Sequence, residues 1–374
     1  MAPKVLYVAS THSHLVNFHR PYLRHYRDRG WQVDAACGGP ALDIPEAHHV
    51  YPIPFAKSIT APENLKALAR LRALIRREGY DLLHLHTSLA AFFARAALWG
   101  LRDRPRVVNT VHGYLFGEAD HGPRARLLLT AERLTAGRTD LLLTMNQEDL
   151  RLARRYRLGR EIRPIPGMGV DFSALTPADP LARVRLRASL GLTEDDVLLI
   201  YPAEFSARKN QLALIRLLPQ LPPRVKLLLP GQGAMLEDCR AQARALDAAR
   251  RVFFPGHVSP MGPWYAAADG AVSVSRSEGL PFNLMEAMAC GLPVAATAVK
   301  GHVDLVEPEA TGLLAPPDDP DALARCFRRL AEDPDLRRRL GQAGREAVQA
   351  YALPRVYPQV LAALGEPAEA YAAL

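Results

Sequence analysis

The stretch AVSVSRSEGLPFNLMEAMACG, residues 271–291, predicts the structural unit from which the chain is built. Its apolar start, residues 271–274, is typical of a buried strand, and a turn containing Gly279 follows. Pro281 suits the first position of a helix, where the missing N–H of proline would have been unpaired anyway. A strand, a turn and a helix in this order are typical of a parallel sheet covered by helices.

The same alternation of apolar runs and amphipathic segments continues in both directions. Predicted strands of the first half are Lys4–Ala9, Gln32–Cys37, Asp81–His86, Arg106–Val111, Asp140–Thr144 and Glu161–Pro164. Those of the second half are Val197–Pro202, Val225–Leu229, Arg251–Phe254, Ala271–Ser275 and Pro293–Thr297. Predicted helices include 211–218, 237–248 and 65–78, the last with an apolar stripe of Leu65, Leu68, Leu71 and Ile75. The alternation predicts an α/β fold with two Rossmann-like domains facing a central cleft.

The length of 374 residues exceeds the roughly 250–300 at which one hydrophobic core stops growing, so two domains are expected. Residues 166–180 are rich in Gly and Pro and predict a linker. We expect domains at 1–170 and 171–352, with residues 353–374 returning to the first domain. The sequence shows neither a leader segment nor an apolar stretch long enough for a membrane span, which favours a cytoplasmic location.

Positive charge is concentrated in the first half of the chain. Residues 1–170 hold 25 Lys and Arg against 15 Asp and Glu, a net +10, whereas the remainder hold 22 against 24, a net −2. This basicity predicts an anionic partner, although solvated helix faces explain it equally well. Nucleic acid is disfavoured because no binding motif or aromatic interleaving accompanies the basic residues. The four cysteines are too far apart to predict a disulfide framework or a zinc cluster.

Two carboxylates and a helix start form the first candidate site. Glu278 precedes the predicted helix and Glu286 lies inside it, so the pair can flank one ligand and accept hydroxyl hydrogens from a sugar and a ribose. The backbone amides of Phe282, Asn283 and Leu284 open the helix and predict an anion site. Ordinary surface acids at a helix start are the alternative.

A basic pair and a glycine-rich turn form the second candidate site. Arg208 and Lys209 follow the strand 197–202 and suit a diphosphate, which Arg binds in a bidentate manner and Lys as a point charge. Gly231 and Gly233 predict a close approach of backbone amides to a ligand. Leu236 occupies the place of the third glycine in the dinucleotide fingerprint, which disfavours a nicotinamide cofactor.

These motifs together resemble those of the retaining glycosyltransferases of the GT4 family, which have the GT-B fold. The family's E-x7-E element is similar to Glu278–Glu286, and its basic pair to Arg208 and Lys209. Further matches are VFFPGHV at 252–258, which resembles the base-binding turn, and TGLL at 311–314. FHRPYL at 18–23, HLHT at 84–87, VHGY at 111–114 and MNQED at 145–149 resemble the subgroup that builds capsular and extracellular polysaccharide.

The resemblance implies transfer of a sugar from a nucleotide donor, with UDP favoured, to a glycan on a polyprenyl diphosphate at the inner face of the cell membrane. The implied catalytic residues are His112, Arg208, Lys209 and Glu278. The implied donor contacts are Gly231, Gly233, His257, Val258, Phe282, Asn283, Leu284 and Glu286. Residues 10–14, STHSH, replace a Gly-Gly loop of many relatives, so His14, His19 and Arg20 are expected to face the acceptor. Neither a metal nor a cofactor is implied, because the two cations do what Mg²⁺ would do.

Other functions stay open from the sequence alone. His84 and His86 share one face of a strand and, with His112 and Asp304, fit the ligand set of a metal-dependent hydrolase. Two glutamates also fit the acid and base of a glycoside hydrolase, and the same fold hosts nucleotide-sugar epimerases. Arginines on two predicted helices suggest contact with anionic lipid: Arg70, Arg72, Arg76 and Arg77, and Arg151, Arg154, Arg155 and Arg157.

Overall fold

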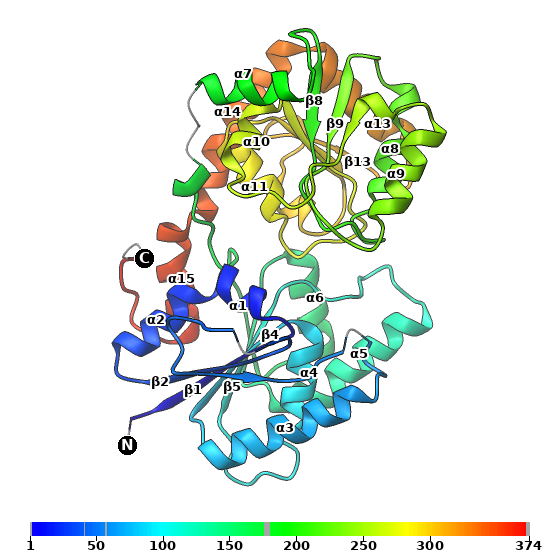
Figure 1. Cartoon of the computed structure of the whole chain (residues 1–374). Helices are drawn as coiled ribbons and strands as arrows, with labels where there is room; N and C mark the ends of the chain where they lie inside the picture. Colours follow the sequence, from blue (N-terminus) through cyan, green and yellow to red (C-terminus); the bar gives the residue numbers. More distant parts are fainter. Residues whose placement is uncertain (1, 41, 57, 176–179, 372–374) are drawn as a thin grey trace. The chain divides into compact units, whose positions relative to one another are not determined.

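The chain forms two compact α/β units. The computed structural model describes residues 2–40, 42–56, 58–175 and 180–371 (Figure 1). Unit 1 comprises Met1–Gly169 and Val356–Leu374, and unit 2 comprises Val170–Arg355. The division falls in the segment whose Gly and Pro content predicts a linker, of which residues 176–179 lie outside the described residues.

Unit 1 is built on a seven-stranded parallel sheet. Its strands are β1 (Lys4–Ala9), β2 (Gln32–Cys37), β3 (His49–Pro52), β4 (Leu82–His86), β5 (Arg106–Val111), β6 (Leu141–Thr144) and β7 (Glu161–Pro164). They lie in the order β3-β2-β1-β4-β5-β6-β7, and the register of β1 with β4 pairs Val5 with Leu82. The strand order reverses between β1 and β4, which is the topological switch point where sheets of this kind bind ligands.

Helices cover both faces of this sheet. They are α1 (His12–Phe18), α2 (Arg20–Asp28), α3 (Glu63–Glu78), α4 (Ser88–Ala96), α5 (Pro123–Thr135), α6 (Gln147–Tyr156) and most of α15 (Leu353–Leu364). Figure 1 shows α2 and α15 on the opposite face from α3 and α4. The ring of Tyr22 on α2 lies 5.3 Å from that of Tyr357 on α15, so the end of the chain is part of this unit.

The apolar stripe of α3 differs from the sequence prediction at one residue. Its buried face includes Ala67, Leu71 and Ile75, which are spaced at helical intervals. Leu65 is 66% exposed because it lies two residues, and therefore about 200°, from Ala67 around the helix. Gly79, with φ of 63°, ends the helix in the left-handed conformation that glycine adopts most readily.

Unit 2 is built on a six-stranded parallel sheet. Its strands are β8 (Val197–Ile200), β9 (Val225–Leu228), β10 (Val252–Phe253), β11 (Gly270–Ser273), β12 (Val294–Thr297) and β13 (Leu313–Ala315). They lie in the order β10-β9-β8-β11-β12-β13, so the switch point is between β8 and β11. The helices are α7 (Pro180–Ser189), α8 (Gln211–Arg216), α9 (Leu236–Ala245), α10 (Gly262–Ala267), α11 (Phe282–Ala289), α12 (His302–Leu305), α13 (Pro320–Glu332) and α14 (Pro334–Ala347).

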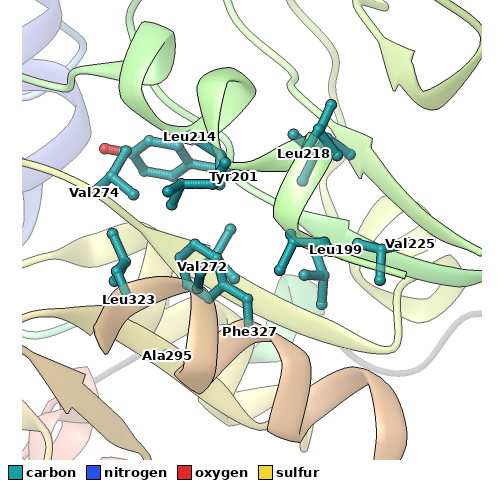
Figure 2. Packing of buried hydrophobic residues seen from close by; sticks show 14 of the residues in the cluster. Leu199, Tyr201, Leu214, Leu218, Val225, Val272, Val274, Ala295, Leu323 and Phe327 are labelled. Atoms are coloured by element: carbon teal, nitrogen blue, oxygen red, sulfur yellow. The ribbon is translucent and has the colours of Figure 1, made fainter. Parts of the chain in front are cut away.

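A hydrophobic core fixes β8 beside β11. Leu199 of β8 and Val272 of β11 belong to the same buried cluster as Phe327 of α13 (Figure 2). Burying a phenylalanine side chain contributes roughly 1.5–3 kcal/mol, so this packing anchors α13 on the sheet. The carboxyl ends of the two strands are thereby held side by side. Within the described residues, no helix has both the length and the apolar character that crossing a bilayer requires.

Candidate active site

The carboxyl ends of β8 and β11 carry a compact group of three charged side chains. Arg208 and Lys209 follow β8, and Glu278 follows β11. Arg208 Nη1 donates to Glu278 Oε2 at 2.8 Å, and Lys209 Nζ donates to Oε1 at 2.5 Å. The Glu278 side chain is only 6% exposed. One carboxylate therefore holds two cations, and the group keeps a net charge of +1.

Hydrogen bonds between the two loops hold these residues in place. The N–H of Arg276 donates to the carbonyl of Arg208 at 2.9 Å. The Tyr201 hydroxyl donates to the carbonyl of Lys209 at 2.9 Å and lies 2.7 Å from the Ser275 hydroxyl. Sequence reasoning missed Tyr201, although a tyrosine at the end of an apolar strand is a residue that can end a core and begin a site.

Opposite charges keep Glu278 ionised despite its burial. Burial alone would raise the pKa of Glu278, but Lys209 and Arg208 outweigh that effect and lower it below the ordinary value. Burial also lowers the pKa of Lys209, against the attraction of Glu278. Glu278 is thus a carboxylate at neutral pH.

Gly301 and His302 lie against the Glu278 loop and were not predicted from the sequence. Gly301 has φ of 80°, and a Cβ atom there would lie 2.9 Å from the Cβ of Glu278. His302 Nδ1 donates to the carbonyl of Thr297 at 2.7 Å, and burial lowers the pKa of His302 to about 4. Its Nε2 is buried without a hydrogen-bond partner among the described residues. This neutral imidazole can accept a hydrogen bond in the site.

The second carboxylate of the motif, Glu286, lies on α11 and has a different environment. Its Oε2 accepts a hydrogen bond from the Tyr265 hydroxyl at 2.8 Å. Burial raises the pKa of Glu286, and the Tyr265 hydrogen bond only partly opposes the rise. Asn283, on the first turn of α11, donates from Nδ2 to the carbonyl of Pro202 at 3.1 Å. The helix start is therefore tied to the end of β8.

Two expectations about the start of α11 are wrong. Pro281 is the residue that precedes the helix, and Phe282 is the first helical residue. The N–H of Leu284 donates to the carbonyl of Pro281 at 3.0 Å, so this amide is not free for an anion. The reason is a tight first turn, in which an i→i+3 bond satisfies a donor that an ideal α-helix would leave unpaired.

The structure gives Gly231 and Gly233 a packing role that the sequence did not reveal. A Cβ atom at Gly231 would lie 2.0 Å from the carbonyl oxygen of Ala203, and one at Gly233 would lie 2.4 Å from that of Phe205. The N–H of Gly231 donates to the carbonyl of Gly256 at 2.8 Å. These glycines let neighbouring backbone segments pack closely, and the Gly231 amide is not offered to a ligand.

The segment that resembles a base-binding turn begins with the edge strand β10 and continues beyond it. Within it His257 is exposed and Val258 is half-buried. Gly256 has φ of 80°, which allows the chain to turn there. Contact of this turn with a nucleotide base stays a prediction.

Unit 1 brings together four histidines at its own switch point. His86 ends β4, His112 follows β5, His14 lies on α1, and His19 connects α1 to α2. The rings of His19 and His86 stack with centroids 3.7 Å apart, and His112 Nε2 lies 3.3 Å from His86 Nδ1. From the sequence, His86 and His112 belonged to the ligand set of the alternative hydrolase, whereas His14 and His19, which come from separate segments, were expected to face the acceptor.

The remaining predicted residues have partners that the sequence did not reveal. Arg20 donates to the buried carboxylate of Glu46, with Nη2 to Oε1 at 2.7 Å, so its charge is balanced within unit 1. Acceptor contact by His14, His19 and Arg20 stays a prediction.

Two members of the predicted hydrolase set are also engaged elsewhere. The His84 ring bonds to the Thr110 hydroxyl at 2.8 Å. Asp304 Oδ2 accepts from the N–H of Gly301 at 3.0 Å and caps α12. The structure therefore does not support these two residues as metal ligands of a hydrolase.

Comparisons with known proteins identify relatives over nearly the whole chain. Residues 183–347 match the family described as Glycosyl transferases group 1, and residues 22–173 match Glycosyltransferase Family 4. "Putative glycosyltransferase EpsD" of Bacillus subtilis is 33% identical over 365 residues, which cover 96% of this chain and 96% of the relative. UDP-Gal:alpha-D-GlcNAc-diphosphoundecaprenol alpha-1,3-galactosyltransferase of Escherichia coli is 25% identical over 315 residues, 81% of each chain. The structure of Anabaena HepE in complex with UDP and glucose has a TM-score of 0.80 at 21% identity and covers 97% of this chain and 99% of that one.

Proposed function

Because this chain belongs to the GT4 family of glycosyltransferases and has the GT-B type of fold, we propose that it is a sugar transferase with a UDP-sugar as donor. In this proposal the acceptor is a lipid-linked glycan, and the configuration of the sugar is retained. The observation that carries the proposal is the buried carboxylate of Glu278, paired with Arg208 and Lys209 at the switch point of unit 2. UDP is favoured because the similar HepE structure holds UDP and glucose. A lipid-linked acceptor is favoured because the Escherichia coli relative is named for an acceptor sugar linked to diphosphoundecaprenol.

In the proposed reaction, Arg208 and Lys209 bind the diphosphate of the donor. The net +1 of the group attracts the anion, and both cations are already held by Glu278 in fixed positions. Negative charge that develops on the leaving diphosphate is then stabilised by preorganised donors, each of which can contribute on the order of 3 kcal/mol. Since these side chains supply the positive charge, the transfer step needs neither a metal at the diphosphate nor a cofactor.

The two glutamates bind different parts of the donor in this proposal. Glu278 accepts hydrogen bonds from hydroxyls of the transferred sugar, and Glu286 accepts them from the ribose. The Tyr265 hydroxyl holds the Glu286 carboxylate in place. His257 and Val258 in the turn after β10 bind the uracil base, with the first amides of α11 near the phosphates.

Retention follows from attack on the same face that the diphosphate leaves. The acceptor oxygen forms its bond to the anomeric carbon as the bond from that carbon to the phosphate oxygen breaks, and the acceptor proton passes to that oxygen. Glu278 is an unsuitable nucleophile because two cations already share its charge. His112 is proposed to contact the transferred sugar.

An apolar cavity in unit 1 supports the lipid-linked acceptor. It encloses about 420 Å³. Its apolar lining includes Ile59, Leu89, Phe92, Leu115, Leu127 and Leu128, and Arg124 and Glu132 add charge. An isoprenoid chain suits the apolar wall, and the Arg124 guanidinium suits a phosphate. The cavity thus offers one contact for the isoprenoid chain and one for the phosphate of a polyprenyl diphosphate.

Exposed arginines support seating of unit 1 on an anionic membrane. Arg70 and Arg76 on α3 and Arg154 on α6 are exposed. Arg72 is a poor candidate, because its Nη1 donates to two backbone carbonyls, those of residues 97 and 99. Each exposed cation near a lipid surface contributes about 1 kcal/mol. Co-sedimentation with vesicles that increases with anionic lipid and decreases with salt is the expected result.

A transfer assay tests the proposed function. Purified protein is incubated with a panel of UDP-sugars and undecaprenyl-diphosphate-linked sugar, and the product anomer is determined by NMR. We expect a glycosylated lipid whose new linkage keeps the donor configuration. Arg338→Ala, which removes an exposed arginine of α14 paired with Asp335, is the control and should transfer normally. UDP release without any glycosylated product from any donor would contradict the proposal.

A further inference from the structure

The histidine cluster of unit 1, defined as His14, His19, His86 and His112, lies where α/β sheets bind ligands. His14 and His19 follow β1, His86 ends β4 and His112 follows β5. The order of the sheet reverses between β1 and β4. None of the charged groups of unit 2 is involved. The cluster is therefore a second assembly of polar side chains, built from residues of unit 1 alone.

The four rings place nitrogens close enough together to bind one metal ion. One nitrogen from each of the four rings lies within 4.8 Å of the others. The distance of 3.3 Å from His86 Nδ1 to His112 Nε2 equals the spacing of about 3.3 Å between two nitrogens of a tetrahedral zinc site.

Four nitrogens of the cluster are buried without a hydrogen-bond partner among the described residues. Both ring nitrogens of His19, Nε2 of His86 and Nε2 of His14 are buried without a hydrogen bond to any described residue. His19 and His86 are fully buried. Buried polar atoms are nearly always hydrogen-bonded or bound to a ligand, so unpartnered nitrogens on three of these four clustered rings indicate a ligand there.

The chemistry of the donors selects the class of ion. A neutral imidazole ring offers the lone pair of one nitrogen to a cation. Imidazole suits Zn²⁺, Cu²⁺ and Ni²⁺, whereas Mg²⁺ and Ca²⁺ require oxygen ligands, which this set does not contain.

We propose that His14, His19, His86 and His112 bind one Zn²⁺ ion, which joins the α1–α2 segment to the ends of β4 and β5. Four protein ligands make a closed site, and closed zinc sites are structural. His112 directs Nε2 toward the ion, so its Nδ1 is left for the sugar contact given to this residue above. The ion and the diphosphate cations lie in different units, and the proposed transfer step does not involve the ion.

Zinc binding is tested on the full chain without a histidine tag. After treatment with a chelator, the protein is titrated with Zn²⁺, its metal content is measured after gel filtration, and its Tm is recorded. We expect one Zn²⁺ per chain and a Tm rise of about 5 °C at a hundredfold excess over Kd. Co²⁺ in place of Zn²⁺ should give the visible absorption of a tetrahedral nitrogen site.

Matched variants locate the ion. His19→Leu and His86→Leu remove one ligand each and should lose the bound metal, the Tm shift and the Co²⁺ absorption. His12→Leu is the control: it removes a histidine from the same helix as His14, but the His12 ring bonds to the carbonyl of Asp43 and lies outside the cluster. It should bind Zn²⁺ normally.

Two results would overturn the proposal. The first is a full chain that retains only sub-stoichiometric Zn²⁺ and gives no tetrahedral Co²⁺ spectrum; this result needs no variant. The second is equal binding by the wild-type protein and a folded His86→Leu variant, which would place the ion elsewhere. Sugar transfer is assayed separately, so failure of zinc binding and failure of the proposed transfer are distinguishable.

Discussion

The two switch points of this molecule are equivalent in topology and opposite in electrostatics. Between β8 and β11, a buried carboxylate is paired with two cations. Between β1 and β4, buried imidazoles carry no charge, and several of their nitrogens lack partners. Burial penalises a charge strongly. The charged groups between β8 and β11 are therefore paired, whereas the imidazoles between β1 and β4 are neutral. Loss of one residue should therefore lower the free energy of unfolding far more at the first site than at the second.

The largest expected effect is on transfer by Lys209→Ala. Removal of one preorganised donor to developing charge costs about 10²–10³ in rate, so kcat with a UDP-sugar should fall by that factor. Lys226→Ala is the matched control, because Lys226 is also a half-buried lysine of unit 2, paired with Asp196 at 3.3 Å. A loss of less than tenfold for Lys209→Ala, or an equal loss for the control, would show that the charged group is not the donor site.

The next effect compares the stability of the two switch points directly. Glu278→Gln leaves Arg208 and Lys209 with uncompensated charge and should lower the free energy of unfolding by about 3 kcal/mol at pH 7. His19→Leu replaces an unpartnered, neutral ring by an apolar side chain of similar size and should change it by less than about 1.5 kcal/mol. Urea denaturation of chelator-treated protein measures both, and equal losses would remove the distinction between the sites.

Much of the fold was readable from the sequence because strands buried on both faces are continuous apolar runs. β1, β2 and β5 begin and end where the sequence predicts. The strand β3 was missed because its residues are only partly buried, and β13 because it has three residues. The local sequence pattern therefore predicts continuous, buried strands well and short edge strands poorly.

The two switch points differed in how far they could be predicted. Glu278 and Glu286 stand in one short segment, so their spacing revealed them. The ion pair of Glu278 with Arg208 joins residues 70 positions apart, and only the adjacency of β8 and β11 brings them together. The histidine cluster needs three neighbouring strands and a helix junction, which no local pattern records.

A smaller effect is expected at Glu286, which is intermediate between the two kinds of site. It is a buried carboxylate with one neutral hydrogen-bond partner, Tyr265. Tyr265→Phe removes that hydrogen bond, which is worth about 1 kcal/mol, so KM for the UDP-sugar should rise about fivefold. Because Tyr265 positions Glu286 and touches no reacting atom, kcat should stay unchanged. A fall in kcat without a change in KM would place Glu286 at the transferred sugar instead of the ribose.

The smallest effect separates the two carboxylates by the sign of their pH dependence. The pKa of Glu278 is lowered in the folded state, so its contribution to stability is present at neutral pH and is lost as the pH falls through its folded pKa. The pKa of Glu286 is raised, so its ionised form opposes folding, and this penalty grows as the pH rises through its folded pKa.

Glu286→Gln should therefore raise Tm at pH 7 by about 2 °C. The gain should disappear below about pH 4, where glutamate is protonated in the unfolded chain as well. Glu278→Gln should show the reverse, with its loss largest at pH 7 and smallest in acid. Thermal unfolding of both variants between these pH values measures the two trends, and parallel curves would mean that the two carboxylates share one environment.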